Sequence, residues 1–162
     1  MQTTQALFDL IASDLMSRQV ITIPQETSLP VAVERLAQAH VSDAPVVDSG
    51  GRCIGLFSTA NLARRAQLAK RAAQQAPAIP GCVCSDWGVV EHDWDTLPAE
   101  AVSWYMTADP ATVSAETPIC ELAKKMTDGH FCRLIVVDAE RHPVGIVACA
   151  DVLAALARST VE

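Results

Sequence analysis

One stretch of this sequence occurs twice, and the repeat limits the possible folds more than any other feature. Residues 44–62 and 134–152 each contain an apolar run that ends in Val-Val-Asp, a short polar turn, a second apolar run through a glycine, and the start of a helix. The second copy lies 90 positions after the first, so Gly55 aligns with Gly145. Few residues are identical, but the apolar positions agree, which is typical of an internal structural repeat. We therefore expect two copies of one folding unit.

Each copy is predicted to fold as strand, helix, strand, strand and helix, which gives an α/β (α+β) protein. In the first copy, strands at 45–47 and 53–57 flank Asp48-Ser49-Gly50-Gly51, a strong turn signal. In the second copy the paired strands are 134–137 and 144–147. Two such copies should pack sheet against sheet around a pseudo-twofold axis and leave two clefts between them. The ends of the strands and the starts of the last helices should open into those clefts.

The predicted organisation has three parts. Residues 1–75 form the first repeat, together with an amphipathic N-terminal helix over residues 7–16. Residues 76–100 have no counterpart in the repeat, and their apolar residues, including Trp87 and Trp94, predict a connector packed on the body rather than a free linker. Residues 101–162 form the second repeat.

Composition and charge exclude several classes of partner. Half of the 162 residues are hydrophobic and 19% are charged, as in soluble globular proteins. A unit of about 55 residues is too small to be stable alone, so the copies should share a core. No run approaches the ~18 apolar residues of a membrane span, and no basic start precedes an apolar run at the N-terminus. The net charge of −7 argues against nucleic acid and anionic membranes as partners. We expect a cytoplasmic protein.

The cysteines predict neither disulfides nor a metal site. Four of the six lie in periodic apolar segments, where free cysteine behaves as a small hydrophobe: Cys53, Cys120, Cys132 and Cys149. Cys82-x-Cys84, with His92 and Asp93 nearby, lacks the second ligand pair that structural zinc requires. Its spacing also differs from the Cys-x-x-Cys of redox motifs. We therefore expect reduced, metal-free thiols.

The order of these signals resembles the CBS domain, a repeat named after cystathionine β-synthase. The resemblance rests on Met-Ser/Thr, a strand that ends at Thr22 or Thr112, a helix, Val-Val-Asp, and Gly-x-x-[Ser/Thr]-x-x-[Asp/Asn], all repeated at equal spacing. It implies a stand-alone bacterial pair of repeats that binds AMP, ADP, ATP or S-adenosylmethionine in the clefts. It also implies association into homodimers and regulation of another protein, which the sequence does not name. Nothing in the chain indicates an enzyme: no Ser-His-Asp order, P-loop or acid pair stands out.

The resemblance implies two clefts that differ in composition, because neither copy has both the hydroxyl and the acid of the family pattern. The first copy has Ser58 and Asn61 at these positions, and the second has Ala148 and Asp151. The cleft that we expect to bind contains Asp151, Arg133, Ile146, Ala148, Ile21, Val41 and Ser42. The second and weaker cleft contains Ser58, Asn61, Leu56, Ala111, Phe131, Cys132 and Asp43.

Charge favours the Asp151 cleft. Its carboxylate can accept hydrogen bonds from both ribose hydroxyls, and Arg133 can neutralise a phosphate. Asn61 accepts through one oxygen only, and Asp43 stands where the other cleft has its cation and should repel phosphate.

Structural roles compete with these ligand roles. Ser58-x-x-Asn61 also fits a helix capping box, whereas Asp151 fits one less well because Ala148 has no hydroxyl for the reciprocal bond. Arg133 fits a solvated charge at a strand end equally well. The alternative functions are a pair without ligand that serves as a dimerisation or protein-interaction scaffold, and a small enzyme.

Overall fold

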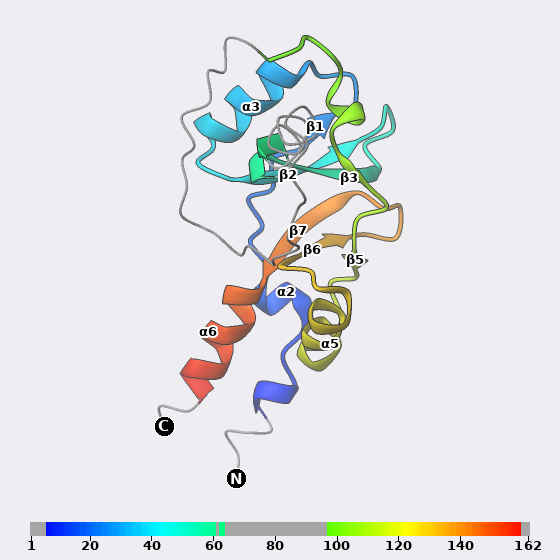
Figure 1. The fold of residues 1–162 in the computed structure, drawn as a ribbon. Helices are drawn as coiled ribbons and strands as arrows, with labels where there is room; N and C mark the ends of the chain where they lie inside the picture. The colour runs from blue at the N-terminus through cyan, green and yellow to red at the C-terminus, as the bar shows by residue number, and fades with distance from the viewer. Residues whose placement is uncertain (1–5, 61, 64–96, 160–162) are drawn as a thin grey trace.

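Two β-sheets stacked face to face form the centre of the protein, and helices cover their outer faces (Figure 1). The computed structural model describes residues 6–60, 62–63 and 97–159. The first sheet has the order β1-β2-β3-β4, with β1 Ile23–Pro24, β2 Asp43–Val47, β3 Cys53–Ser58 and β4 Thr107–Ala108. The second has the order β5-β6-β7, with β5 Thr112–Val113, β6 Arg133–Val137 and β7 Pro143–Ala148. The helices are α2 Ala12–Leu15, α3 Leu29–Gln38, α5 Ile119–Gly129 and α6 Cys149–Ser159, with a 3₁₀ helix at Val102–Trp104.

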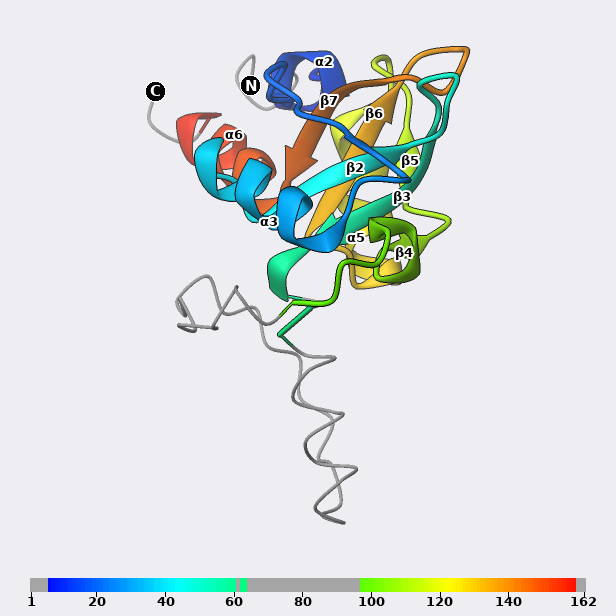
Figure 2. The ribbon, with the colours of Figure 1, turned by 90° about the horizontal axis from the view of Figure 1, so that it is seen from above.

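The two sheets repeat each other with the 90-residue offset of the sequence. Strands β2 and β6 begin and end 90 positions apart, and so do β3 and β7. Each antiparallel pair carries an irregularity at the same place, between Val46 and Val47 and between Val136 and Val137. Seen from above, β2 and β3 lie over the strands of the second sheet (Figure 2). The predicted α+β fold, with two pseudo-twofold-related repeats packed sheet to sheet, is confirmed.

The aspartate of each Val-Val-Asp motif shapes a hairpin turn. Asp48 Oδ1 accepts hydrogen bonds from the backbone N–H groups two and four residues later, at 2.9 and 3.0 Å. Asp138 Oδ1 does the same in the second turn, at 2.9 and 2.8 Å. Each turn includes a residue of positive φ, Gly51 at 79° and Arg141 at 68°. The motif that marks the repeat is therefore a turn-forming element.

The two repeats exchange short segments. Strand β4 follows the connector in sequence but pairs with β3 and completes the first sheet. In the equivalent place on the second sheet, Ser17 exchanges two backbone hydrogen bonds with Ile146, at 2.9 and 3.1 Å. Each crossing segment brings a methionine, Met106 or Met16, against the central glycine of a strand. The glycines Gly55 and Gly145 leave the space that these methionines fill.

Gly55→Ala is expected to lower the free energy of unfolding by about 1–3 kcal/mol, because the added methyl overpacks the crossing. A Cβ at residue 55 would overlap Met106 Sδ and lie 3.0 Å from the carbonyl oxygen of Thr107. Gly50→Ala is the matched control, since its nearest neighbour, Asp48 Oδ1, would lie at 3.4 Å. Urea denaturation measures the free energy of unfolding of both variants. Equal losses would show that the space between residue 55 and Met106 can accommodate the added methyl group.

The apolar interior consists of two clusters rather than the single shared core that was expected. Each cluster lies between one sheet and its helices, and each is completed by a segment from the other half of the chain. Val102 joins Phe57 and Leu36 in the first cluster, and Ala12 joins Leu134 and Val147 in the second. All six are at most 1% exposed. The repeats therefore depend on each other through exchanged segments.

The continuous N-terminal helix predicted over residues 7–16 is wrong. Residues 6–8 and α2 are helical, but the chain breaks between them. The Leu10 carbonyl accepts a hydrogen bond from Ile119 N–H at 2.9 Å, and Ile11 N–H donates to Asp14 Oδ2 at 3.0 Å. These bonds replace helical ones at the break. The strand that was expected to end at Thr22 lies slightly later in the chain, as the two-residue strand β1 at Ile23–Pro24.

The last helix predicted for the first repeat has its start among the described residues, since residues 59–60 and 62–63 are helical, whereas its continuation and most of the 76–100 connector lie outside them. The described end of the connector packs on the body: Leu97 lies against the first cluster, and the Glu100 carbonyl accepts a hydrogen bond from Leu29 N–H at 2.8 Å.

Candidate functional site

Asp151 lies in the first turn of α6, immediately after β7. Its Oδ2 accepts a hydrogen bond from Ala148 N–H at 2.7 Å, so the carboxylate closes the N-terminus of the helix. The expectation that Asp151 would fit a capping role poorly is wrong, because this bond needs no hydroxyl at Ala148. Within the described chain, Asp151 Oδ1 has no hydrogen-bond partner and remains able to accept one from a ligand. The start of α6 also offers backbone N–H groups that are not used within the helix.

Four of the seven residues predicted for this cleft lie together. Arg133 and Ala148 are directly opposite each other across β6 and β7, and Ile146 lies two residues before Ala148 on the same face. Asp151, three residues after Ala148, accepts a hydrogen bond from the Ala148 backbone N–H. All four are partly exposed. This face is turned toward the first sheet, since Arg133 reaches a residue of β2.

That residue is Asp43, and the ion pair between them was not foreseen. Arg133 Nη1 lies 2.7 Å from Asp43 Oδ2, with side-chain exposures of 34% and 9%. These residues were predicted to lie in opposite clefts, with Arg133 attracting phosphate and Asp43 repelling it. The structure joins them, because equivalent positions close to a twofold axis meet across it. Opposite charges 90 positions apart were the signal that could have predicted this pair.

The other predicted members of the Asp151 cleft come from the first repeat. Val41 and Ser42 immediately precede Asp43, and both are exposed. Ile21 is half-buried against the first apolar cluster. The pairing of Asp43 with Arg133 brings this part of the first repeat toward β6, and the presence of all three residues in the cleft stays a prediction.

The residues predicted for the weaker cleft are more widely distributed. Ser58 is opposite Asp43, and Leu56 is opposite Pro45, on the first sheet. Ala111 and Phe131 line a hollow of about 670 Å³ together with residues of α5, including Lys124 and Lys125. The carbonyl of Cys132 accepts a hydrogen bond from Cys149 N–H. Asn61 lies outside the described residues, so this cleft also stays a prediction.

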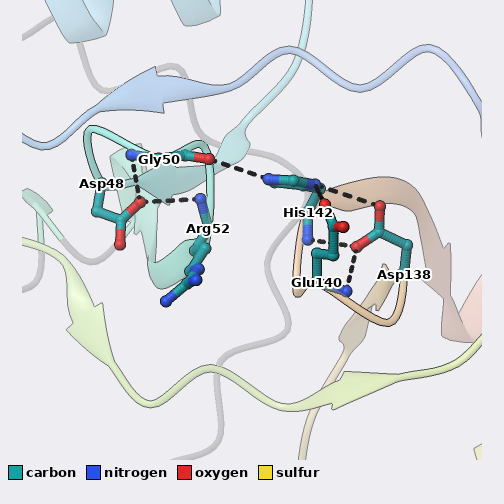
Figure 3. Close-up of polar contacts among 6 residues, drawn as sticks. All are labelled: Asp48, Gly50, Arg52, Asp138, Glu140 and His142. Atoms are coloured by element: carbon teal, nitrogen blue, oxygen red, sulfur yellow. Dashed lines mark hydrogen bonds and ion pairs between the residues drawn. The ribbon is translucent and has the colours of Figure 1, made fainter.

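A second contact between the repeats joins the two hairpin turns (Figure 3). His142 Nε2 lies 2.9 Å from the Gly50 carbonyl oxygen, and its Nδ1 lies 3.3 Å from Asp138 Oδ2 and 3.5 Å from Glu140 Oε2. Both ring nitrogens thus face acceptors, an arrangement that only the protonated imidazole satisfies with two donors. The bond to Gly50 and the charge of Asp138 raise the pKa of His142. A polar hollow of about 760 Å³ lies between the turns. The sequence analysis did not predict this junction.

The family model of the CBS domain matches this sequence twice, at residues 12–67 and 99–158. The chain belongs to the CBS domain family. It therefore contains a tandem pair of CBS domains, and the resemblance stated from the sequence is confirmed.

Similar proteins extend over most of this CBS pair. A CBS domain-containing protein from Dictyostelium discoideum is 28% identical over 147 residues, which is 89% of each chain. CBSX2 from Arabidopsis thaliana is 26% identical over 136 residues, which is 82% of this chain and 57% of that protein.

Solved structures of CBS pairs have the same fold. CBSX2 in complex with AMP gives a TM-score of 0.67 at 21% identity, covering 93% of this chain and 98% of that one. The CBS domain pair of protein MJ0100, in complex with 5′-methylthioadenosine and S-adenosyl-L-methionine, gives 0.65 at 21% identity, covering 92% and 97%.

Two further findings concern the described residues of the CBS pair. None of their helices is long and apolar enough to cross a membrane. No three His, Cys, Asp or Glu side chains among them gather closely enough to hold a metal ion. The Cys82, Cys84, His92 and Asp93 group lies outside this part of the chain.

The junction between the turns is expected to make stability depend on pH. Because folding raises the pKa of His142, its contribution to stability is complete below the unfolded value of about 6.5 and is lost as pH rises through the folded value. The melting temperature of the wild type should therefore exceed that of His142→Ala by more at about pH 5.5 than at about pH 8.5. His142→Gln keeps a donor but does not titrate, so its pH profile should resemble that of the alanine variant. Equal differences at both pH values would exclude a protonated His142.

Proposed function

We propose that this CBS pair is a regulatory module that binds an adenosine-containing ligand of the AMP, ADP or ATP class in the Asp151 cleft. The observation that carries the proposal is the grouping of Asp151, Ala148, Ile146 and Arg133 at the start of α6, on a face turned toward the other repeat. Two CBS pairs of the same fold are bound to AMP and to S-adenosyl-L-methionine with 5′-methylthioadenosine. CBS pairs are regulatory rather than catalytic units, so we propose no reaction.

Each group has a chemical role in this proposal. Asp151 Oδ1 accepts a hydrogen bond from a ribose hydroxyl while Oδ2 continues to bond Ala148 N–H. The remaining N–H groups at the start of α6 and the Arg133 guanidinium bind phosphate. Ile146 from β7 and Ile21 from the first repeat contact the two faces of the adenine, with Val41 and Ser42 at its edge.

The ion pair favours one alternative, a scaffold without ligand. Arg133 is already bonded to Asp43, so a phosphate must compete with a carboxylate for its guanidinium. In a protein that binds no phosphate, the ion pair between Arg133 and Asp43 would serve only to join the two repeats. The two functions differ in whether any adenosine compound binds.

Calorimetric titration with AMP, ADP, ATP and S-adenosylmethionine, with GMP as the control for the base, distinguishes them. The proposed function requires saturable binding of an adenosine compound and weaker binding of GMP. No heat with any of the four adenosine compounds, and no shift in melting temperature, would favour the scaffold.

We also propose that the module is a homodimer formed through the helix after each hairpin. On α6, Leu153 is 63% exposed and Leu156 is 48% exposed, and their spacing of three residues places these two apolar side chains on one face of the helix. Light scattering at micromolar concentration should give about twice the chain mass of 17.3 kDa. Leu153→Glu together with Leu156→Glu should give the monomer mass, and a monomeric wild type would contradict the proposal.

A further inference from the structure

Cys132 and Cys149 adjoin the open end of the β6–β7 hairpin. The ladder ends with Arg133 opposite Ala148, so the next pair in register is Cys132 and Cys149. Beyond the last ladder pair, Cys149 N–H donates a hydrogen bond to the Cys132 carbonyl oxygen at 3.0 Å, which holds the two backbones together at this point. Directly opposite residues of antiparallel strands have Cα atoms about 4.5–5.5 Å apart, within the range of about 4.4–6.8 Å that a disulfide spans.

The alternation of side chains along the strands puts both cysteines on the helix-covered side of the sheet. Leu134 and Val147 are fully buried in the second apolar cluster, and the cysteines lie two residues beyond them along each strand. Cys149 packs against this cluster, and its Sγ lies 3.6 Å from the Phe131 carbonyl oxygen. That carbonyl belongs to the peptide that leads into Cys132. The sulfur of Cys149 is therefore already beside the backbone that carries its partner.

The two thiols differ in exposure in a way that suits stepwise oxidation. Cys132 is exposed and Cys149 is partly buried, whereas Cys53 is buried. An oxidant in solution can reach Cys132 first, and Cys149 is the thiol placed to react with the product. Cys120 is also exposed but lies at the second residue of α5, outside the hairpin.

We propose that Cys132 and Cys149 are an oxidation site that forms a reversible disulfide with hydrogen peroxide. The Cys132 thiolate attacks one peroxide oxygen, the O–O bond breaks, and the other oxygen leaves as water after protonation, which gives a sulfenic acid. The Cys149 thiolate then attacks the Cys132 sulfur, the S–S bond forms, and the sulfenic oxygen leaves as the second water. Two thiols lose two electrons and two protons, and one peroxide becomes two water molecules. Without peroxide both cysteines remain thiols.

The position of the bond would link oxidation to the proposed ligand cleft. Cys132 precedes Arg133, and Cys149 is the first residue of α6, two residues before Asp151. A disulfide would tie the end of β6 to the start of α6, where the ribose and phosphate contacts are proposed. This consequence rests on the proposed function, whereas formation of the disulfide does not.

The test uses the full chain with Cys82→Ser, Cys84→Ser and Cys120→Ser, which leaves Cys53, Cys132 and Cys149. Hydrogen peroxide should reduce the number of reactive thiols in denatured protein from three to one, and dithiothreitol should restore it. Trypsin should release one cross-linked species that joins residues 126–133 to residues 142–158, identified by mass spectrometry. Adding Cys132→Ser should abolish that species.

Retention of both thiols, oxidation of Cys132 alone to the sulfinic acid, or a cross-link between two chains would each overturn the proposal. AMP titration of the reduced and oxidised protein then tests the link to the cleft. We expect at least about a 3-fold change in affinity, and equal affinities would remove the link without affecting the disulfide. If reduced protein binds no adenosine compound while the disulfide forms, the proposed function fails and the oxidation site stands.

Discussion

Asp151→Ala is expected to weaken AMP binding by about 10- to 100-fold, the largest effect that we predict for a single substitution. The variant loses the carboxylate that accepts from the ribose, and a hydrogen bond to a charged group contributes about 1.5–3 kcal/mol. It also loses the bond from Ala148 N–H to Oδ2, so the free energy of unfolding should fall by about 1 kcal/mol. Calorimetric titration and urea denaturation measure the two effects separately.

Asp151→Asn separates the capping role from the ligand role. The asparagine side-chain oxygen can still accept from Ala148 N–H, so stability should remain close to that of the wild type. Ribose then meets a neutral group, and AMP affinity should fall by about 10-fold. Asn61→Ala, in the cleft that we expect to be weaker, should bind AMP like the wild type. Loss of binding in Asn61→Ala with full binding in Asp151→Ala would reverse the assignment of the two clefts.

Arg133→Ala is expected to destabilise the protein by about 1–3 kcal/mol, because it leaves the almost buried Asp43 without its arginine. The loss should be smaller than the 3–5 kcal/mol typical of a fully buried pair, since about a third of the Arg133 side chain is exposed to water. Asp43→Ala should cost less than Arg133→Ala, because a freed arginine can extend into solvent. Urea denaturation of both single variants and the double variant measures the coupling. Strictly additive losses would show that the pair contributes nothing.

The same pair predicts opposite changes in ligand affinity. Arg133→Ala should weaken the binding of AMP more than the binding of adenosine, because only AMP carries the phosphate. Asp43→Asn removes the carboxylate that holds Arg133, so the affinity for AMP should rise by about 3- to 10-fold. Adenosine is the control, and its affinity should stay unchanged. If Asp43→Asn weakens AMP, then the ion pair holds Arg133 in position for the ligand instead of competing with it.

The repeat in the sequence predicted the architecture because spacing and apolar periodicity are local properties. The shared Val-Val-Asp motif and the glycines at positions 55 and 145 gave the strands, the turns and their pseudo-symmetry, and the structure repeats them at the same offset. The α6 helix and its Asp151 also followed from this pattern.

The remaining features depend on contacts between distant residues. Asp43 and Arg133 were assigned to separate clefts because each was considered within its own copy, while the contact forms across the twofold axis. The contact of His142 with Gly50 was missed for the same reason, since it also joins the two repeats. The N-terminal helix was predicted to be too long because its apolar spacing is helical, whereas the chain breaks where the Leu10 carbonyl accepts a hydrogen bond from Ile119 N–H. Tertiary bonds outweighed local propensity there.

The most direct test of the central claim is a titration of AMP into protein labelled with ¹³C at the isoleucine methyl groups, observed by NMR. Ile21 and Ile146 are the two isoleucines that we predict for the Asp151 cleft, whereas the equivalent positions of the other cleft are Ala111 and Leu56. The proposal predicts that the signals of Ile21 and Ile146 shift together and saturate at one AMP per chain, while fully buried Ile23 changes little. Binding of AMP that leaves both signals unchanged would contradict it.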